Sequence, residues 1–400
     1  MSRARDLADY VSTGVTSTEL DKLDGLTATT DELNLVDGSV SGPLSHRNLI
    51  INGAMQVAQR GTSATVNGFG TVDRFKTDHN GVNENTTQAQ HTLTSSDTGP
   101  YEEGFRYSFH ITNGNQTSGA DAIDRIIIPY IIEAQDIANS GWNYISTSSY
   151  ITLSFWCKSS VAQNFYGRLQ TSDGTAQNYV FETGSLSANT WTKITKTIPG
   201  NSNLQFDNNN EAGLTIEFNL FRGTDTTGSV TLNTWATYNA STRVPDMTST
   251  WYTTNDATWE ITGVQLERGQ VATPFEHRTY ADELQRCERY CQTSFDTGVT
   301  PAYNTSKGIY STVPCYQSGY SIYAFNLSTP MRTTPSVDFY CAGNQDTAAG
   351  HWSFHDGSWH HQDINLHSST TENIICCDIR TGTTDQALLM NGQYIAFAEF

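Results

Sequence analysis

Three apolar stretches decide the fold of this chain: residues 150–156 (YITLSFW), 215–221 (TIEFNLF) and 258–266 (TWEITGVQL). Each is rich in β-branched and aromatic residues, which are typical of strands. Clusters of Gly, Asn, Asp and Ser separate them, for example at residues 207–210 and 223–228. Many short strands at this spacing predict a β-sandwich or jelly roll over residues 46–275, with further strands over residues 294–400.

Composition supports an all-β protein that does not bind nucleic acid. Aromatic residues make up 11% of the 400 residues and charged residues only 16%, so the chain has enough apolar surface to build cores and does not resemble a disordered chain. The net charge is −19 and the 22 basic residues form no cluster. Binding to phosphates needs clustered Lys and Arg, so we expect no nucleic-acid partner.

The first 45 residues contain a 13-residue repeat, TSTELDKLDG at 16–25 and TTDELNLVDG at 29–38. Each copy opens with the Thr-x-x-Glu spacing of a helix capping box and closes on Asp-Gly, a turn signal. One helical turn cannot bury its own apolar residues, so it needs neighbouring copies or other chains. We therefore expect a short helical stalk in an oligomer, whose apolar contacts are Leu20, Leu23, Leu33 and Val36.

A second helix is expected at residues 278–293 (RTYADELQRCERYCQT), within a collar at 276–293. Its apolar residues recur at spacings of four, three and four, which is as narrow as a coiled-coil seam. We interpret this stripe as a threefold contact, and the alternative is packing of the helix on its own sandwich. The residues of the stripe are Tyr280, Leu284, Cys287 and Cys291.

Three segments in order resemble bacteriophage tail fibre proteins. SRARDLADYVSTG at 2–14, with the repeats after it, resembles their N-terminal region. NLIINGAMQVAQRGTS at 48–63 and VDRFK at 72–76 resemble the start of a fibre domain of marine phages. The stretch 261–294 is similar to the end of that domain and the following collar. The sandwich also resembles carbohydrate-binding jelly rolls, through YITLSFWCKS and WEITGVQLERG.

This resemblance implies a virion protein that forms a homotrimer. Residues 1–45 would attach it to other tail or virion proteins, and the C-terminal region would bind a host cell-surface glycan or receptor. The protein would be assembled in the host bacterial cytoplasm. The start of the chain lacks an apolar run of secretory length, and no run is long enough for membrane insertion. A tail adaptor, or a head fibre or decoration protein with a purely structural role, remains an alternative.

Histidine and tryptophan are concentrated near the C-terminus, in residues 351–361 (HWSFHDGSWHH). Imidazoles from three chains could hold a transition metal, or a hairpin tip could offer indole faces and polar edges to a sugar. The third possibility is a hairpin whose aromatic rings pack across strands. We favour no metal and predict glycan or receptor contacts here, at His351, Trp352, His355, Asp356, Trp359, His360 and His361. The residues Trp251 and Tyr252, set among polar neighbours, are a second predicted contact surface.

Nothing in the sequence favours an enzyme or a cofactor. The chain has no Gly-x-Ser-x-Gly elbow, no His-Glu-x-x-His and no phosphate-binding Gly-rich loop before a Lys. The seven cysteines are irregularly spaced, and we expect buried thiols, with Cys376 and Cys377 facing opposite sides of one strand. Paired acids such as Asp121 and Asp124 leave a polysaccharide depolymerase as an alternative.

Overall fold

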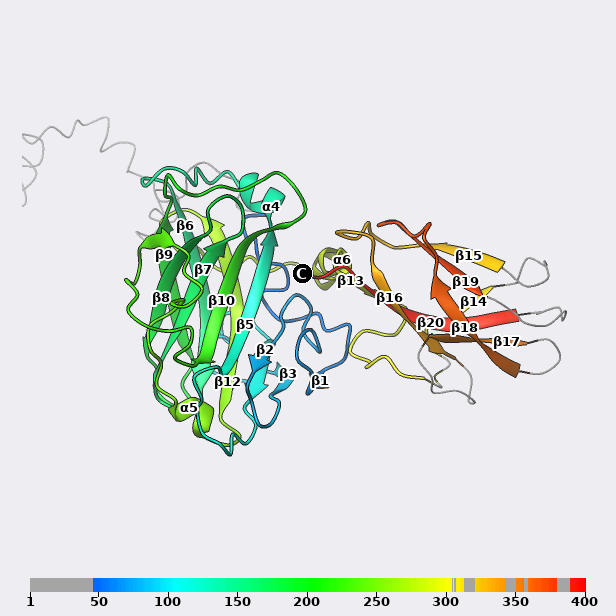
Figure 1. Ribbon diagram of the computed structural model, residues 1–400, viewed down its shortest axis with the longest axis horizontal. Coiled ribbons are helices and arrows are strands. Elements are labelled where there is room, and N and C mark those ends of the chain that lie inside the picture. The colour runs from blue at the N-terminus through cyan, green and yellow to red at the C-terminus, as the bar shows by residue number, and fades with distance from the viewer. Residues whose placement is uncertain are drawn as a thin grey trace, which may run out of the picture. The chain divides into compact units, whose positions relative to one another are not determined.

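The computed structural model describes residues 46–303, 305, 307–312, 321–342, 350–355, 359–379 and 389–400 (Figure 1). These residues belong to one compact unit, which spans Pro43–Phe400. The predicted stalk contacts Leu20, Leu23, Leu33 and Val36 lie outside the described residues, as does the whole segment 1–45. The helical stalk and the threefold assembly therefore stay predictions.

Two six-stranded antiparallel sheets form the larger part of the fold (Figure 1). The first sheet contains, in spatial order, β1 (Ser63–Ala64), β3 (Thr87–Thr92), β4 (Tyr107–Thr112), β12 (Thr258–Arg268), β6 (Tyr150–Ser159) and β9 (Thr192–Pro199). The second contains β11 (Trp235–Thr237), β8 (Gln177–Ser185), β7 (Asn164–Thr171), β10 (Ala212–Arg222), β5 (Arg125–Glu133) and β2 (Asp78–Asn80).

The strand order identifies this sandwich as a jelly roll. Its eight main strands are ordered β4-β12-β6-β9 in the first sheet and β5-β10-β7-β8 in the second. Along the chain the strands therefore pass between the sheets at β4 to β5, β5 to β6, β6 to β7, β8 to β9, β9 to β10 and β10 to β12. Two interlocked Greek keys with this alternation define the jelly roll, so the predicted all-β jelly roll is confirmed.

The core between the two sheets follows directly from the period of two in the sequence. In β6, Ile151, Leu153 and Phe155 are fully buried between the sheets. Trp156, which follows Phe155, is half-buried and belongs to the opposite face of the first sheet. Strands with one face in a core and one face outside are expected in antiparallel sandwiches.

A third, eight-stranded sheet with its own core follows the jelly roll. Its core contains Trp352, Phe339, Ile375 and Tyr394. Cys377 also belongs to this core and its neighbour Cys376 is buried outside it. The strands are β13 (Cys291–Thr293), β14 (Tyr310–Thr312), β15 (Ser321–Asn326), β16 (Ser336–Cys341), β17 (His351–His355), β18 (Trp359–Leu366), β19 (Ile374–Ile379) and β20 (Leu389–Phe397).

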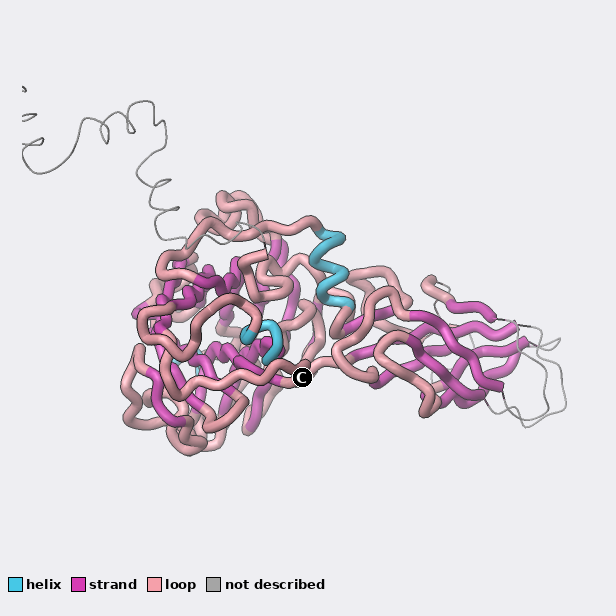
Figure 2. Tube along the Cα trace, turned by 90° about the horizontal axis from the view of Figure 1, so that it is seen from above, coloured by secondary structure: helices cyan, strands magenta, loops and turns pink. Residues whose placement is uncertain are grey.

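The helices of the described residues are short: α4 (Ala134–Ala138), α5 (Thr250–Thr253) and α6 (Tyr280–Glu288) (Figure 2). Helix α6 begins after Thr279, whose hydroxyl accepts a hydrogen bond from the backbone NH of Asp282 at 3.2 Å. None of the helices in the described part of the chain has the length and apolar character needed to cross a membrane.

The predicted helix at 278–293 needs two corrections. It ends at Glu288, and Cys291 belongs to β13, which pairs with β20. Cys287 and Cys291 are fully buried within the chain itself, so they cannot form an intermolecular seam as predicted. Tyr280 is exposed and Leu284 is half-buried, so the proposed threefold contact remains a prediction for these two residues.

Candidate ligand-binding face on the first sheet

Polar side chains form a row across the outer face of the first sheet. In the antiparallel register, Ala89 of β3 lies opposite His110 of β4. His110 lies opposite Glu260 of β12, and Glu260 lies opposite Lys158 of β6. Residues that are directly opposite each other project from the same side of a sheet. The row therefore places His110 and Lys158 on either side of the Glu260 carboxylate, on the sheet face turned away from the core.

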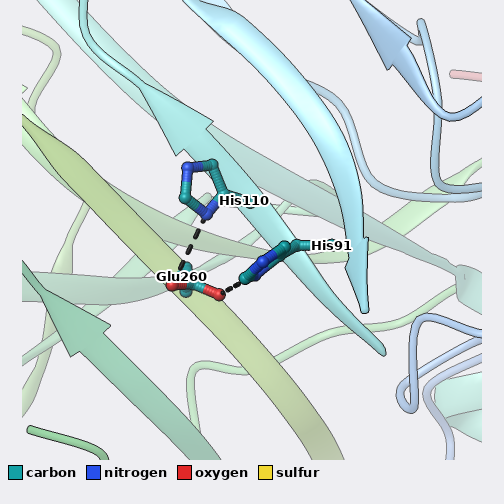
Figure 3. Close-up of side chains that lie close together, drawn as sticks. All are labelled: His91, His110 and Glu260. Carbon is teal, nitrogen blue, oxygen red and sulfur yellow. Dashed lines mark hydrogen bonds and ion pairs between the residues drawn. The ribbon is translucent and has the colours of Figure 1, made fainter. Parts of the chain in front are cut away.

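Glu260 is the centre of this row (Figure 3). Its Oε1 lies 2.8 Å from Lys158 Nζ, and its Oε2 accepts a hydrogen bond from Ser108 Oγ at 2.7 Å. His91 of β3 places Nδ1 3.0 Å from Oε2, and His110 places Nδ1 3.4 Å from Oε1. The Glu260 side chain is 3% exposed, whereas that of His91 is 47% exposed, so the cluster opens to solvent at His91.

The electrostatics of the row keep Glu260 ionised. Burial alone would raise the pKa of its carboxyl group, but hydrogen bonds from His110, Lys158, Ser108 and His91 outweigh burial and hold the pKa well below its ordinary value. Burial likewise opposes the charge of Lys158, and its contacts with Glu260 and Asp97 raise the Lys158 pKa. Glu260 and Lys158 are thus both charged at neutral pH.

Two half-buried tryptophans extend this face toward the edge of the sheet. Trp156 of β6 lies opposite Lys193 of β9, and Trp191 comes two residues before Lys193. Lys158 Nζ lies 4.7 Å from the centre of the Trp191 ring, and Lys193 Nζ lies 5.7 Å from that of Trp156. Cations at such distances from an indole are attracted to the ring.

The loop between β3 and β4 fixes both indoles through carboxylates. Trp191 Nε1 donates to Asp97 Oδ1 at 3.0 Å, and Trp156 Nε1 donates to Glu103 Oε2 at 3.0 Å. Lys193 Nζ lies 2.9 Å from both carboxylate oxygens of Glu103. Burial opposes the charge of Asp97, but hydrogen bonds from Trp191, the Thr94 backbone and Lys158 lower its pKa. We call Asp97, Glu103, Trp156, Lys158, Trp191 and Lys193 the tryptophan platform.

The tryptophan platform has the chemistry of a carbohydrate-binding surface. A pyranose ring presents C–H groups on its faces and hydroxyl groups at its edges. Indole rings can cover the C–H faces, while carboxylates accept hydrogen bonds from hydroxyls and ammonium groups donate to them. Because the indole NH groups are already held by Asp97 and Glu103, the rings are oriented before any ligand arrives.

The outer face of the second sheet differs because its polar groups are closed off. Glu217 of β10 lies between Arg168 and Arg222, and all three side chains are at most 5% exposed. The segment after β10 covers them: Arg222 Nη1 donates to Thr226 Oγ1 at 3.1 Å, and the Arg168 guanidinium lies 5.5 Å from the Tyr238 ring centre. This cluster is enclosed in the protein and does not offer its charges to a ligand.

The predicted contact surface at Trp251 and Tyr252 is wrong. Helix α5 turns both rings into the jelly-roll core, where they are 0% and 1% exposed. Trp251 Nε1 donates to the Thr258 carbonyl at 3.0 Å. The Tyr252 ring stacks on Phe221 with a centroid distance of 4.3 Å, and its hydroxyl donates to Asp124 Oδ2 at 2.9 Å. Polar neighbours in the sequence thus flank a buried pair.

The histidine-rich segment forms the expected antiparallel hairpin, β17 paired with β18. Trp352 is 1% exposed, packs against Phe339 and donates from Nε1 to the Gln393 carbonyl at 3.2 Å, so its prediction as a contact for a ligand is wrong. His351 Nε2 lies 2.7 Å from Asp363 Oδ1. His361 Nδ1 lies 3.9 Å from Cys341 Sγ. Asp356 and the side chains of His355, Trp359 and His360 lie outside the described set.

The tryptophan platform and the Glu260 cluster were not singled out from the sequence. The available signal was the alternation in YITLSFWCKS, which places Trp156 and Lys158 on the face opposite Phe155 and Cys157. Nothing in the sequence indicates that His91, His110 and Glu260 share one face, because that depends on strand order and register.

Comparisons with known proteins give distant structural likenesses. No protein-family model matches the chain, and no curated protein matches it. Tailspike protein 4 of bacteriophage CBA120, in its enzymatically active domain, matches with a TM-score of 0.28 and 12% identity over 55% of this chain and 21% of that chain. A CBM4 structure matches with a TM-score of 0.28 and 12% identity over 55% of this chain and 99% of that chain. The CBM22-1 xylan-binding domain of Xyn10C from Paenibacillus barcinonensis matches with a TM-score of 0.27 and 8% identity over 56% of this chain and 96% of that chain.

Proposed function

We propose that this chain is a bacteriophage fibre protein that binds a host-surface glycan, and that the tryptophan platform on the first sheet is a binding surface. The observation that carries glycan binding is the pair Trp156 and Trp191, two half-buried indoles on one sheet face whose NH groups are held by carboxylates. Flat apolar rings framed by fixed charges are suited to sugar rings and poorly suited to an apolar ligand.

The position of the tryptophan platform also supports this proposal. It lies on the regular strands β6 and β9 and on the segment directly before β9, so the sheet fixes the spacing of the two rings. The loop that carries Asp97 and Glu103 adds the polar contacts. A surface of this kind binds without a large conformational change, because little side-chain entropy remains to be lost.

The virion role rests on the sequence resemblance to tail fibres. In this proposal residues 1–45 attach the chain to other virion proteins, and Leu20, Leu23, Leu33 and Val36, together with Tyr280 and Leu284, join three chains. The C-terminal sheet, with the histidine-rich hairpin, would lie toward the host and supply further contacts. The protein acts by adhesion and not as an enzyme. Three copies of a weak glycan site would act together, because avidity in a trimer raises the effective affinity.

The test is binding of the full chain to a panel of purified bacterial surface polysaccharides by affinity electrophoresis. Trp156→Ala and Trp191→Ala should each weaken binding at least tenfold, about 1.4 kcal/mol. Tyr166→Ala is the matched control, because Tyr166 is a half-buried aromatic residue on β7 of the second sheet. Retained binding in both tryptophan variants would refute the assignment of the platform. Release of reducing ends from a bound polysaccharide would replace adhesion by depolymerase activity.

A further inference from the structure

We propose that His91, His110 and Glu260 form a binding site for a divalent transition metal ion of the zinc type. The three residues come from the neighbouring strands β3, β4 and β12, and their side chains converge on one point of the outer sheet face (Figure 3). Their candidate ligand atoms all lie within 4.8 Å of one another. Lys158 of the tryptophan platform contacts Glu260, but the site takes a different class of ligand, so the proposal goes beyond glycan binding.

Two of the ligand separations are close to those of tetrahedral coordination. Two ligand atoms at about 2.0–2.1 Å from a zinc ion with tetrahedral angles lie about 3.3 Å apart. Nδ1 of His91 lies 3.0 Å from Oε2 of Glu260, and Nδ1 of His110 lies 3.4 Å from Oε1. Each imidazole is thus spaced from one carboxylate oxygen as two ligands of one ion would be, and side-chain rotation is needed to bring all three groups onto a single ion.

His110 provides the second, independent observation. Its Nδ1 is buried and lies 3.4 Å from Oε1 of Glu260, a longer contact than those of Lys158 at 2.8 Å and Ser108 at 2.7 Å. Its Nε2 lies 3.2 Å from the Thr112 hydroxyl. When Nε2 donates to that hydroxyl, Nδ1 carries a lone pair directed at a carboxylate oxygen. A metal ion at this position would replace the Nδ1 proton that otherwise faces the Glu260 carboxylate, and Nε2 would then donate to the Thr112 hydroxyl.

The surroundings of Glu260 orient it as a ligand. Ser108 Oγ donates to Oε2, and Lys158 Nζ contacts Oε1 while also lying 3.1 Å from Asp97 Oδ1. Outer contacts of this kind hold a ligating carboxylate in position. The charge of Lys158 is balanced by Asp97, so Glu260 still contributes a negative charge to a bound cation. With three protein ligands and an exposed His91, a fourth coordination position is open to water or to a ligand.

The ligand set selects the class of metal. Two imidazole nitrogens and one carboxylate oxygen suit Zn²⁺, Ni²⁺ or Cu²⁺, whereas Ca²⁺ and Mg²⁺ prefer oxygen ligands alone. We therefore expect the full chain to bind Zn²⁺ with measurable heat at neutral pH, and to show no comparable binding of Mg²⁺.

The test is isothermal titration of the full chain with Zn²⁺ at pH 7.5, with Co²⁺ absorption spectra as a second measurement of coordination. His91→Ala and His110→Ala should each lower the affinity of one site at least tenfold. The His91 side chain is 47% exposed, so its variant should fold normally. The matched control replaces His355, His360 and His361 by alanine, because the histidine-rich hairpin holds the densest group of imidazoles in the sequence.

Retention of one Zn²⁺ per chain in the hairpin control, together with its loss in the His91 and His110 variants, would support the proposal. Loss of binding in the hairpin control, or unchanged affinity in both His91→Ala and His110→Ala, would overturn it. Absence of heat and of a Co²⁺ spectrum in the wild-type chain would overturn it as well, and the cluster would then be a hydrogen-bond network only.

Discussion

The enclosed carboxylate Glu217 offers a quantitative test of the fold, because its removal leaves two buried arginines without their partner. Glu217 Oε1 accepts hydrogen bonds from Arg168 Nε and Arg222 Nη2, both at 2.8 Å, and Oε2 accepts one from Arg168 Nη2 at 2.7 Å. Burial opposes the charge of Glu217, but the two guanidinium groups outweigh it and lower the pKa of Glu217 to about 2. We expect Glu217→Gln to destabilise the jelly roll severely.

Two arguments give the same size of effect. Breaking a buried ion pair by removing one partner costs about 3–5 kcal/mol, because the remaining charge is buried and uncompensated. The pKa of Glu217 falls from an ordinary value of 4.5 to about 2, and at about 1.36 kcal/mol per unit this corresponds to about 3 kcal/mol of folding free energy. A loss of about 3 kcal/mol is a large part of the stability of an ordinary domain.

The sign of the pH dependence follows from the lowered pKa. A carboxyl group whose pKa is lower in the folded than in the unfolded state stabilises the fold above the unfolded value, here about 4.5. This contribution is lost as the pH falls from about 4.5 toward 2. The difference in unfolding free energy between wild type and Glu217→Gln should therefore reach its full size, about 3 kcal/mol, at pH 7 and be smaller at pH 3.

The assay is urea denaturation followed by tryptophan fluorescence at pH 7 and at pH 3. Glu182→Gln is the matched control, since Glu182 is a half-buried acid on the neighbouring strand β8 whose Oε2 accepts a hydrogen bond from Asn164. It should change the unfolding free energy by less than about 0.5 kcal/mol. If Glu217→Gln were as stable as the control at pH 7, the arginines would have to be solvated or repositioned. The description of the cluster as enclosed would then be wrong.

Two further predictions concern the core and the assembly. Tyr252→Phe removes the hydrogen bond to Asp124, whose Oδ1 has no hydrogen-bond partner among the described residues. We therefore expect the free energy of unfolding to fall by about 1–3 kcal/mol, measured by thermal unfolding. An unchanged melting temperature would indicate that water replaces the hydroxyl. The full chain should have three times its monomer mass by light scattering on a sizing column. The double variant Leu20→Ser with Leu33→Ser should have a lower mass. A monomeric wild type would refute the trimer.

The sequence predicts much of the jelly roll and little of its candidate binding face. Strand content follows from local information, because runs such as YITLSFW alternate between the core and the outside with a period of two. The helix predicted at 278–293 is longer than the observed one, and this error also comes from the use of local information alone. A stripe with spacings of four, three and four continues to Cys291, but pairing of β13 with β20 takes over the residues after Glu288. Tertiary pairing overrides a local helical pattern in such cases.

Local polarity was a misleading guide for aromatic residues. Trp251 and Tyr252 have Ser and Thr neighbours, which suggested a surface loop. One turn of helix α5 is enough to direct both rings inward while the small polar residues face solvent. Trp156 shows the opposite case, since it lies in an apolar strand segment and yet belongs to the outer face. Side-chain direction, and not the composition of the neighbourhood, decides which aromatic residue is available to a ligand.

The two outer faces of the jelly roll show why a site could not be located from residue types alone. Both faces carry acids beside bases at opposite positions on adjacent strands, Glu260 with Lys158 on the first sheet and Glu217 with Arg168 on the second. What distinguishes them is the segment that lies over each. The segment after β10 encloses the arginines, whereas the loop before β4 holds the indoles by their NH groups and leaves the rings half-buried. Which sheet face is left open to a ligand therefore depends on the loops that cover the sheets, and these are the part of the structure that strand periodicity does not predict.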